Sequence, residues 1–152
     1  MSASARLSEL GLTLPTVAAP VAAYVPAVRT GNLVWTSGQL PFVDGALPIT
    51  GKVGAEVEAG RAKELAQTCA LNALAAIAAE IGDLERVRRV VKVVGFVASA
   101  PGFFGQPGVI NGASELLGQV FGDAGRHARS AVGVAVLPLD APVEVEVVVE
   151  VE

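Results

Sequence analysis

The sequence predicts an α+β domain, in which a mostly antiparallel sheet carries two helices on one of its faces. Segments rich in valine or alternating in polarity indicate strands, and apolar residues that recur at helical spacing indicate helices. These elements follow one another along the chain in the order β, β, α, β, α, β, β. A length of 152 residues is typical of a single domain built around a single hydrophobic core.

The N-terminal segment, residues 1–23, is predicted to form an arm that precedes a domain of residues 24–152. A short amphipathic helix is expected around Ser4 to Leu10, and the glycine that follows would end it. The chain is then expected to continue through Pro15 and Pro20 as an extended arm. This part of the sequence indicates little about function.

The next part of the chain is expected to contain a hairpin, two helices and a central strand. A glycine-containing turn would join the two strands of the hairpin, Tyr24 to Val28 and Leu33 to Leu40. Apolar residues at helical spacing predict helices over Glu56 to Ile81 and over about Pro107 to Phe121. Between them, Val87 to Ala98 is too rich in β-branched residues for a comfortable helix and is expected to be a central strand.

The C-terminal segment is predicted to form two paired antiparallel strands, Ala128 to Val136 and Val143 to Val151, with a proline-containing connection between them. Alternating valines and glutamates give the second strand one apolar and one acidic face. Because a slip of one residue would bury the glutamates, matching the valine faces places Arg129 on the acidic face, opposite Glu150. Glu144 would then lie roughly 20 Å from Arg129 along the strands.

The composition predicts an oligomer. Hydrophobic residues make up 52% of the chain and charged residues only 17%, which implies more apolar surface than a monomer of this size comfortably hides. With both helices on one face of the sheet, the other face has no helix to cover it. That face is expected to carry Ala131, Gly133 and Ala135, whose small side chains would allow the backbone of another subunit to approach closely.

The charge balance argues against nucleic acids and anionic membranes as partners, because such binding depends on clustered lysine and arginine. The formal net charge is −4. The only basic cluster consists of Arg86, Arg88, Arg89 and Lys92 and is expected to be a solvated strand entrance. No stretch has the length of a membrane span, and the N-terminus lacks the apolar segment of an export signal, so a cytoplasmic location is expected.

No metal ion or cofactor is expected. The single cysteine, Cys69, lies in an alanine- and leucine-rich helical pattern and is expected to be a small core residue, without a disulfide or a metal. The histidine, aspartate and glutamate residues show no spacing typical of metal ligands, and no glycine-rich phosphate loop opens a helix.

Several short motifs follow one another in order between Tyr24 and Val151. They are Thr36-Ser37-Gly38-Gln39-Leu40-Pro41, Gly82-Asp83-Leu84, Asn111, Arg129-Ser130, Leu137-Pro138 and Val143-Glu144-Val145-Glu146. Together with Tyr24, this combination resembles the RidA/YjgF family of enamine/imine deaminases, which is also labelled L-PSP endoribonuclease-like. The resemblance implies a chorismate-mutase-like fold and a homotrimer with three sites in the clefts between subunits. It also implies cofactor-independent hydrolysis of reactive 2-imino or 2-amino-enoic acids to 2-keto acids and ammonia.

Arg129 and Glu144 are the central residues of the site that the resemblance implies. The guanidinium of Arg129 offers a planar fork of donors that suits a substrate carboxylate, a geometry that lysine would not reproduce. Glu144 would orient the attacking water or transfer protons to and from nitrogen. If the two residues lie roughly 20 Å apart in one chain, a site that contains both needs two chains, which agrees with clefts between subunits.

The remaining site residues are also carried over from the resemblance. The backbone around Ser37, Gly38 and Gln39 would face the reacting centre, because glycine permits close approach, and Ser37 is a further catalytic candidate. Tyr24 would close the cleft and offer a hydroxyl group. Asn111, in the second helix, would contact the substrate.

Each assignment has a structural alternative. Arg129 could pair with Glu150 across the strands as a surface ion pair worth about 0.5 kcal/mol, although the family resemblance favours a bound ligand. Tyr24 could be a half-buried anchor, and Ser37 a hydroxyl at a strand end. His127, the sole histidine, is expected on the same face as Arg129, either as a strand cap or as a general base.

The chain departs from the family pattern in two places. Many members carry a cysteine where this chain has Ala131, and the N-terminus is longer than in the commonest members. The leading hypothesis is a deaminase that acts on substrates of the 2-iminobutanoate and 2-iminopropanoate type. The alternative is a non-catalytic trimer that binds small carboxylates, whereas ribonuclease activity suits an acidic chain poorly.

Overall fold

The computed structural model describes residues 1–17 and 22–152, which contain three α-helices and five strands. The helices are α1 (Ala3–Glu9), α2 (Ala59–Ile81) and α3 (Gln106–Phe121). The strands are β1 (Ala27–Thr30), β2 (Leu33–Thr36), β3 (Val87–Ala98), β4 (Ala128–Val134) and β5 (Val143–Val151). Short 3-10 turns follow the longer elements at η1 (Leu84–Arg86), η2 (Gly122–Gly125) and η3 (Pro138–Asp140). The part of the predicted arm at Pro20 lies outside the described residues.

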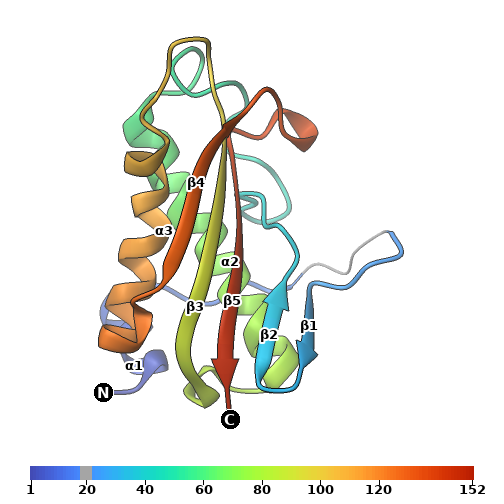
Figure 1. Cartoon of the computed structure of the whole chain (residues 1–152), viewed down its shortest axis with the longest axis vertical. Helices are drawn as coiled ribbons and strands as arrows, with labels where there is room; N and C mark the ends of the chain where they lie inside the picture. The colour runs from blue at the N-terminus through green and yellow to red at the C-terminus, as the bar shows by residue number, and fades with distance from the viewer. Residues whose placement is uncertain (18–21) are drawn as a thin grey trace.

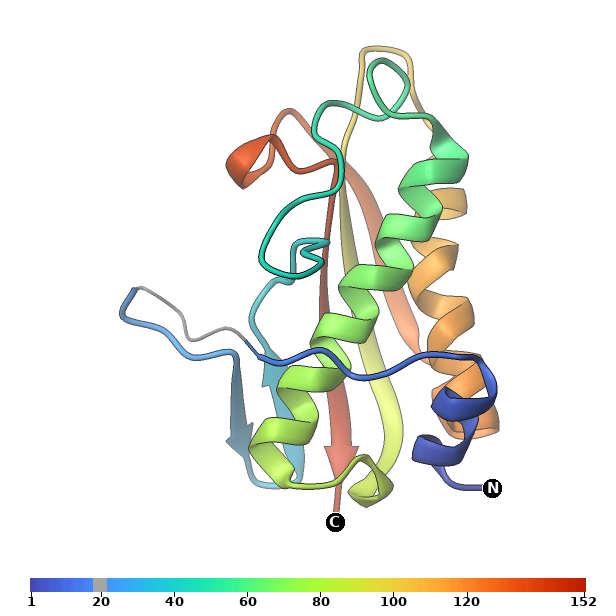
Figure 2. The same cartoon turned by 180° about the vertical axis from the view of Figure 1, so that it is seen from behind.

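The two long helices lie on one face of the sheet, with α2 behind the strands in Figure 1 and in front of them in Figure 2. Helix α3 packs on β3 and β4, whereas α2 packs on β5 and the β1–β2 hairpin. The strand order is β1-β2-β5-β3-β4, and every neighbouring pair is antiparallel except β3 and β4. The predicted α+β fold, with a mostly antiparallel sheet and both long helices on one face, is confirmed.

Most predicted element boundaries are close to those observed. The strand from Val87 to Ala98 is confirmed at both ends, and α3 begins one residue earlier than expected. Helix α2 begins only at Ala59, because the carboxylate of Glu56 accepts a hydrogen bond from the backbone N–H of Lys52 in a turn that precedes the helix. The first hairpin is shorter than predicted, and β1 starts just after Pro26, which has no N–H to donate.

The predicted pairing of β4 with β5 is wrong, because β3 lies between them. Val93 of β3 is the cross-strand partner of both Arg129 in β4 and Val147 in β5. Strands β3 and β4 are joined through α3 and run parallel, as such a crossover allows. Alternation determines which face each residue occupies but not which strand lies next to which. The fully buried valines of β3 favour the central position, and β4 takes the edge.

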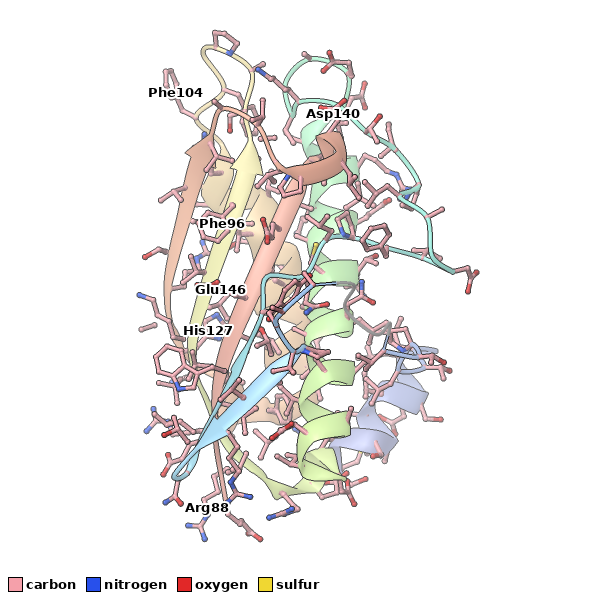
Figure 3. The ribbon with its side chains drawn as sticks, turned by 90° about the vertical axis from the view of Figure 1, so that its right-hand side faces the viewer. Arg88, Phe96, Phe104, His127, Asp140 and Glu146 are labelled. Carbon is pink, nitrogen blue, oxygen red and sulfur yellow. The ribbon has the colours of Figure 1, made fainter. Side chains whose placement is uncertain are left out.

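As a consequence, Arg129 does not share a face with the glutamates of β5. It lies in one row with Val93 and Val147, which are buried beneath the helices, so it belongs to the helix-covered side. Glu146 and the other glutamates of β5 alternate with those buried valines and lie on the uncovered side. Figure 3 shows Phe96 and Glu146 over the strands, away from α2.

The small residues that were predicted to line the uncovered face lie elsewhere. Ala131 packs against the core, and a Cβ built on Gly133 would contact Gln106 of α3. Ala135 follows the end of β4 and is exposed. The uncovered face instead exposes larger apolar side chains, namely Val28, Trp35 and Val132.

Helix α1 belongs to the same hydrophobic core as the sheet and the long helices. Its buried residues are Ala3 and Leu7. The carboxylate of Glu85 accepts hydrogen bonds from the backbone N–H groups of Ser4 at 3.0 Å and Ala3 at 3.1 Å, and these bonds hold the pKa of Glu85 below its usual value. The division into an arm of residues 1–23 and a domain of residues 24–152 stays a prediction.

Helices α2 and α3 cross at close range where Gly112 faces Lys63. A Cβ at Gly112 would overlap the backbone carbonyl of Lys63, so Gly112→Ala is expected to lower the free energy of unfolding by about 2 kcal/mol. Gly118 lies in the same helix with open space around it, so Gly118→Ala is expected to stabilise the protein by up to about 1 kcal/mol through helix propensity. Urea unfolding measures the free energy of unfolding of both variants. Equal changes in the two would contradict the close approach of the helices at Gly112.

Candidate functional site

The edge strand β4 and helix α3 together hold the guanidinium group of Arg129. Its Nη1 atom donates hydrogen bonds to Oδ1 of Asn111 at 2.8 Å and to Oγ of Ser114 at 3.1 Å. Its Nη2 atom donates to the carbonyl oxygen of Pro107 at 3.2 Å. Asn111 and Ser114 lie three residues apart on one face of the helix, so both reach the same side chain. We call Arg129, Asn111, Ser114 and His127 the arginine cluster.

The guanidinium of Arg129 has donors that remain unused. Of the five N–H groups of an arginine, three bond to α3, and the Nε–H has no acceptor among the described residues. Within the same part of the chain, no carboxylate forms an ion pair with it. The predicted alternative, an ion pair with Glu150, is wrong because Glu150 lies opposite Leu33 and Arg89. Arg129 is thus a cation held in a fixed position, and its unused N–H groups are suited to donate hydrogen bonds to a carboxylate ligand.

Glu144 lies on the uncovered side of the sheet, beside the loop that follows β2. A Cβ built on Gly38 would overlap the carboxylate of Glu144, so any larger residue at position 38 would require the Glu144 side chain to move. Burial raises the pKa of Glu144 above its usual value, and the negative charge of nearby Glu146 raises it further. Glu144 therefore takes up a proton more readily than an ordinary glutamate, which suits a group that transfers protons.

The residues that flank this glycine are held by hydrogen bonds. The hydroxyl of Ser37 donates to the carbonyl of Val25 at 2.6 Å, which is the structural role of a hydroxyl at a strand end. Gln39 pairs through its backbone with Val145 of β5. Tyr24 is 58% exposed and is therefore no half-buried anchor in the single chain. It lines a shallow surface hollow together with Ala22, Ala23, Val25, Val28 and Ser37.

The structure brings the predicted site residues together in two groups. Arg129 and Asn111 lie in the arginine cluster, whereas Glu144 lies with the segment of residues 37–39 on the other face. Arg129 and Val147 share a row two strands apart, and Glu144 is three residues further along β5. Ordinary strand spacings put the Cα atoms of Arg129 and Glu144 about 14 Å apart. A small acid cannot bridge them within one chain, although the predicted 20 Å rested on the wrong pairing.

Sequence reasoning missed Ser114, although its position three residues after Asn111 was an available signal. His127 was expected on the same face as Arg129, and it does lie within reach of α3. Its Nε2 atom is 2.9 Å from Oγ of Ser114, and its Nδ1 atom is 2.6 Å from the carbonyl oxygen of Gly125. Both ring nitrogens are therefore engaged with groups of the protein itself.

Among residues 1–17 and 22–152, no group of three or more His, Cys, Asp or Glu side chains is arranged to hold a metal ion. Over the same ranges, no helix combines the length and the apolar character that crossing a membrane requires. Cys69 is buried in the core as predicted, with its sulfur 3.9 Å from the carbonyl oxygen of Val143, and burial raises the pKa of its thiol.

The fold and the site define a class of protein: an α+β domain with a positioned arginine at the edge of its sheet, with which no carboxylate of the described residues forms an ion pair. Comparison with known proteins identifies the family. The family described as "YjgF/chorismate mutase-like, putative endoribonuclease" matches residues 4–151. The chain belongs to this RidA/YjgF family, as its motifs predicted.

Similar proteins match the chain over almost its full length. Protein TCP17 of Trypanosoma cruzi is 47% identical over 148 residues, which are 97% of this chain and 92% of that protein. A crystal structure of a protein of unknown function from Agrobacterium tumefaciens is 49% identical with a TM-score of 0.93, and the match covers 99% of this chain and 92% of that one. The structure of E. coli TdcF with bound serine is 26% identical with a TM-score of 0.62, over 90% of this chain and 94% of that one.

Proposed function

We propose that the protein hydrolyses reactive 2-imino and 2-amino-enoic acids to 2-keto acids and ammonia, with Arg129 binding the carboxylate of the substrate. The observation that carries this proposal is the state of the Arg129 guanidinium. Three hydrogen bonds to α3 position it, and no acidic side chain of the described residues neutralises its charge. Such a cation is suited to a carboxylate, which it would bind through two parallel hydrogen bonds.

The reaction needs a water molecule at the C=N carbon and transfers of protons to nitrogen. In its protonated form Glu144, whose pKa is raised by burial, would give a proton to the imine nitrogen, and as a carboxylate it would take one from the attacking water. Addition of water gives a carbinolamine, and loss of ammonia from the carbinolamine leaves the 2-keto acid. One imine and one water thus become one keto acid and one ammonia, with no oxidant or reductant.

The functional unit in this proposal is a homotrimer, in which each site combines Arg129 of one subunit with Glu144 of another. The uncovered sheet face supports an assembly, because Val28 is 52% and Trp35 50% exposed, and contact with another copy would remove them from water. Light scattering is expected to give three times the chain mass of 15.4 kDa. A monomer at working concentration would leave the two residues on separate faces and contradict the proposal.

The similarity to E. coli TdcF supports the class of ligand. That protein was solved with bound serine, which carries its nitrogen and its carboxylate on the same carbon atom. The proposed 2-imino acids share this arrangement, with a C=N bond in place of the amine. The carbon to be attacked is bonded directly to the carboxylate. A guanidinium that binds the carboxylate would therefore also fix the position of that carbon.

The test is an assay that couples a serine or threonine dehydratase to this protein. The dehydratase releases the short-lived enamine and imine, and the appearance of keto acid is followed with and without the protein. Acceleration above the spontaneous rate is expected, in proportion to the amount of protein added. If the wild-type protein does not change the rate, the proposed hydrolysis is wrong.

A second candidate is a non-catalytic trimer that binds small carboxylates. The observation that favours it is Ala131, which packs against the core two residues after Arg129, where many family members carry a cysteine. This candidate predicts that 2-keto acids raise the melting temperature of the protein, as any ligand of the folded state does. It also predicts that the coupled assay shows no acceleration, which separates it from the leading proposal.

A further inference from the structure

The arginine cluster contains a chain of hydrogen bonds that ends at a histidine. The Oγ atom of Ser114 lies 3.1 Å from Nη1 of Arg129 and 2.9 Å from Nε2 of His127. The hydroxyl group is therefore shared between the guanidinium and the imidazole. The other ring nitrogen of His127, Nδ1, lies 2.6 Å from the carbonyl oxygen of Gly125.

The direction of this chain follows from the carbonyl of Gly125, which can only accept a hydrogen bond. Nδ1 of His127 must therefore carry the hydrogen, and in the neutral ring Nε2 is then an acceptor. The hydroxyl of Ser114 donates to Nε2, so a lone pair of its oxygen is left to accept from Nη1 of Arg129. The hydrogen bonds run from Arg129 to Ser114, then to His127, and then to Gly125.

The far end of the chain is well anchored. Gly125 is buried at the end of η2, which packs against α3, and a Cβ at Gly125 would overlap the carbonyl of Leu117. No larger residue fits there without moving the backbone. The carbonyl that orients His127 therefore belongs to a packed part of the structure, and the orientation of the imidazole follows from it.

We propose that His127 is a positioning residue, which holds the guanidinium of Arg129 in its binding orientation through the hydroxyl of Ser114. This inference rests on the proposed function of Arg129 as the carboxylate-binding group. Without the imidazole, the Ser114 hydroxyl is free to turn and to donate to water. One of the three contacts that fix Arg129 is then weakened, and its free N–H groups meet a carboxylate in a less defined geometry.

The first test is nitrogen NMR of the free wild-type protein and its variants, which needs no substrate. At mildly alkaline pH, Nδ1 of His127 is expected to be protonated and Nε2 unprotonated, and Nε of Arg129 is expected to be as rigid as the backbone. His127→Ala should make the Arg129 side chain mobile. His127→Gln places an amide oxygen near the position of Nε2 and should restore the rigidity. A protonated Nε2 with a bare Nδ1, or an unchanged Arg129 in His127→Ala, would overturn the inference.

The second test uses the coupled assay. His127→Ala is expected to lower kcat/KM about tenfold, mainly through KM, because one hydrogen bond to a charged group is weakened. Ser114→Ala added to His127→Ala should cost little more, because both changes break the same connection. Additive losses, or a loss in kcat alone, would overturn the inference. If the wild-type protein is inactive while the NMR result holds, the proposed function fails and the positioning of Arg129 by His127 stands.

Discussion

Replacing Arg129 with alanine is expected to return keto-acid release to the spontaneous rate, with kcat/KM lowered at least about 100-fold. The guanidinium is the only group of the arginine cluster that is permanently charged, and its unused N–H groups are the donors available to a carboxylate. Without it, the substrate is neither bound nor oriented. The dehydratase-coupled assay measures the loss, and the circular dichroism spectrum shows whether the variant is folded.

The matched control for this variant is Arg126→Ala. It removes the same charge three residues away, but the Arg126 side chain is 88% exposed, and its one ion pair within the described residues is with Asp123 at 4.0 Å. Full activity is expected. Arg129→Lys keeps the charge but loses the planar fork, so most of the activity should still be lost. Equal effects of Arg126→Ala and Arg129→Ala, or an active Arg129→Ala, would rule out carboxylate binding by Arg129.

Glu144→Gln is expected to make the protein less active and more stable. The loss of a group that transfers protons should lower kcat by about 100-fold or more. Glutamine has no charge to bury, so at neutral pH the variant should melt at a higher temperature than the wild-type protein. Kinetics and thermal unfolding on the same samples measure both effects, and the combination is typical of residues whose functional role opposes stability.

The pH dependence of the stability effect follows from the raised pKa of Glu144. The folded protein holds this proton more tightly than the unfolded chain, so its contribution to stability is complete below the pKa of the unfolded state. That contribution is lost as the pH rises through the higher pKa of the folded state. The gain from Glu144→Gln should therefore be present at neutral pH and absent in acid. A gain in stability of equal size at neutral and at acidic pH would contradict burial of the charge as its cause.

Glu146→Gln is the control on the same strand and the same face. Its negative charge contributes to the raised pKa of Glu144, so its removal should lower that pKa. We expect activity to be retained and the limb of the pH–rate profile that Glu144 sets to move to lower pH. A loss of activity as large as that of Glu144→Gln would mean that proton transfer does not belong to Glu144 alone.

Local patterns in the sequence were sufficient for most of the fold. The valine-rich strand β3 and the apolar stripes of α2 and α3 depend on periodicity, which is a property of neighbouring residues. The α+β class follows from the order of these elements, and the motifs around Arg129 and Glu144 identified the family. The residue types also indicated the chemistry, because a guanidinium suits a carboxylate and a glutamate suits proton transfer.

Only the tertiary structure decided which strands are neighbours, and with that the geometry of the site. The alternation in β4 and β5 was correctly recognised, yet β3 lies between them, which moves Arg129 to the helix-covered side and Glu144 to the other. Alternation determines the face of each side chain relative to its own strand. Which strand lies beside a given strand depends on placing β3 in the interior of the sheet, with a neighbouring strand on each side. The contacts of Arg129 with Asn111 and Ser114 follow from that arrangement and from no local pattern.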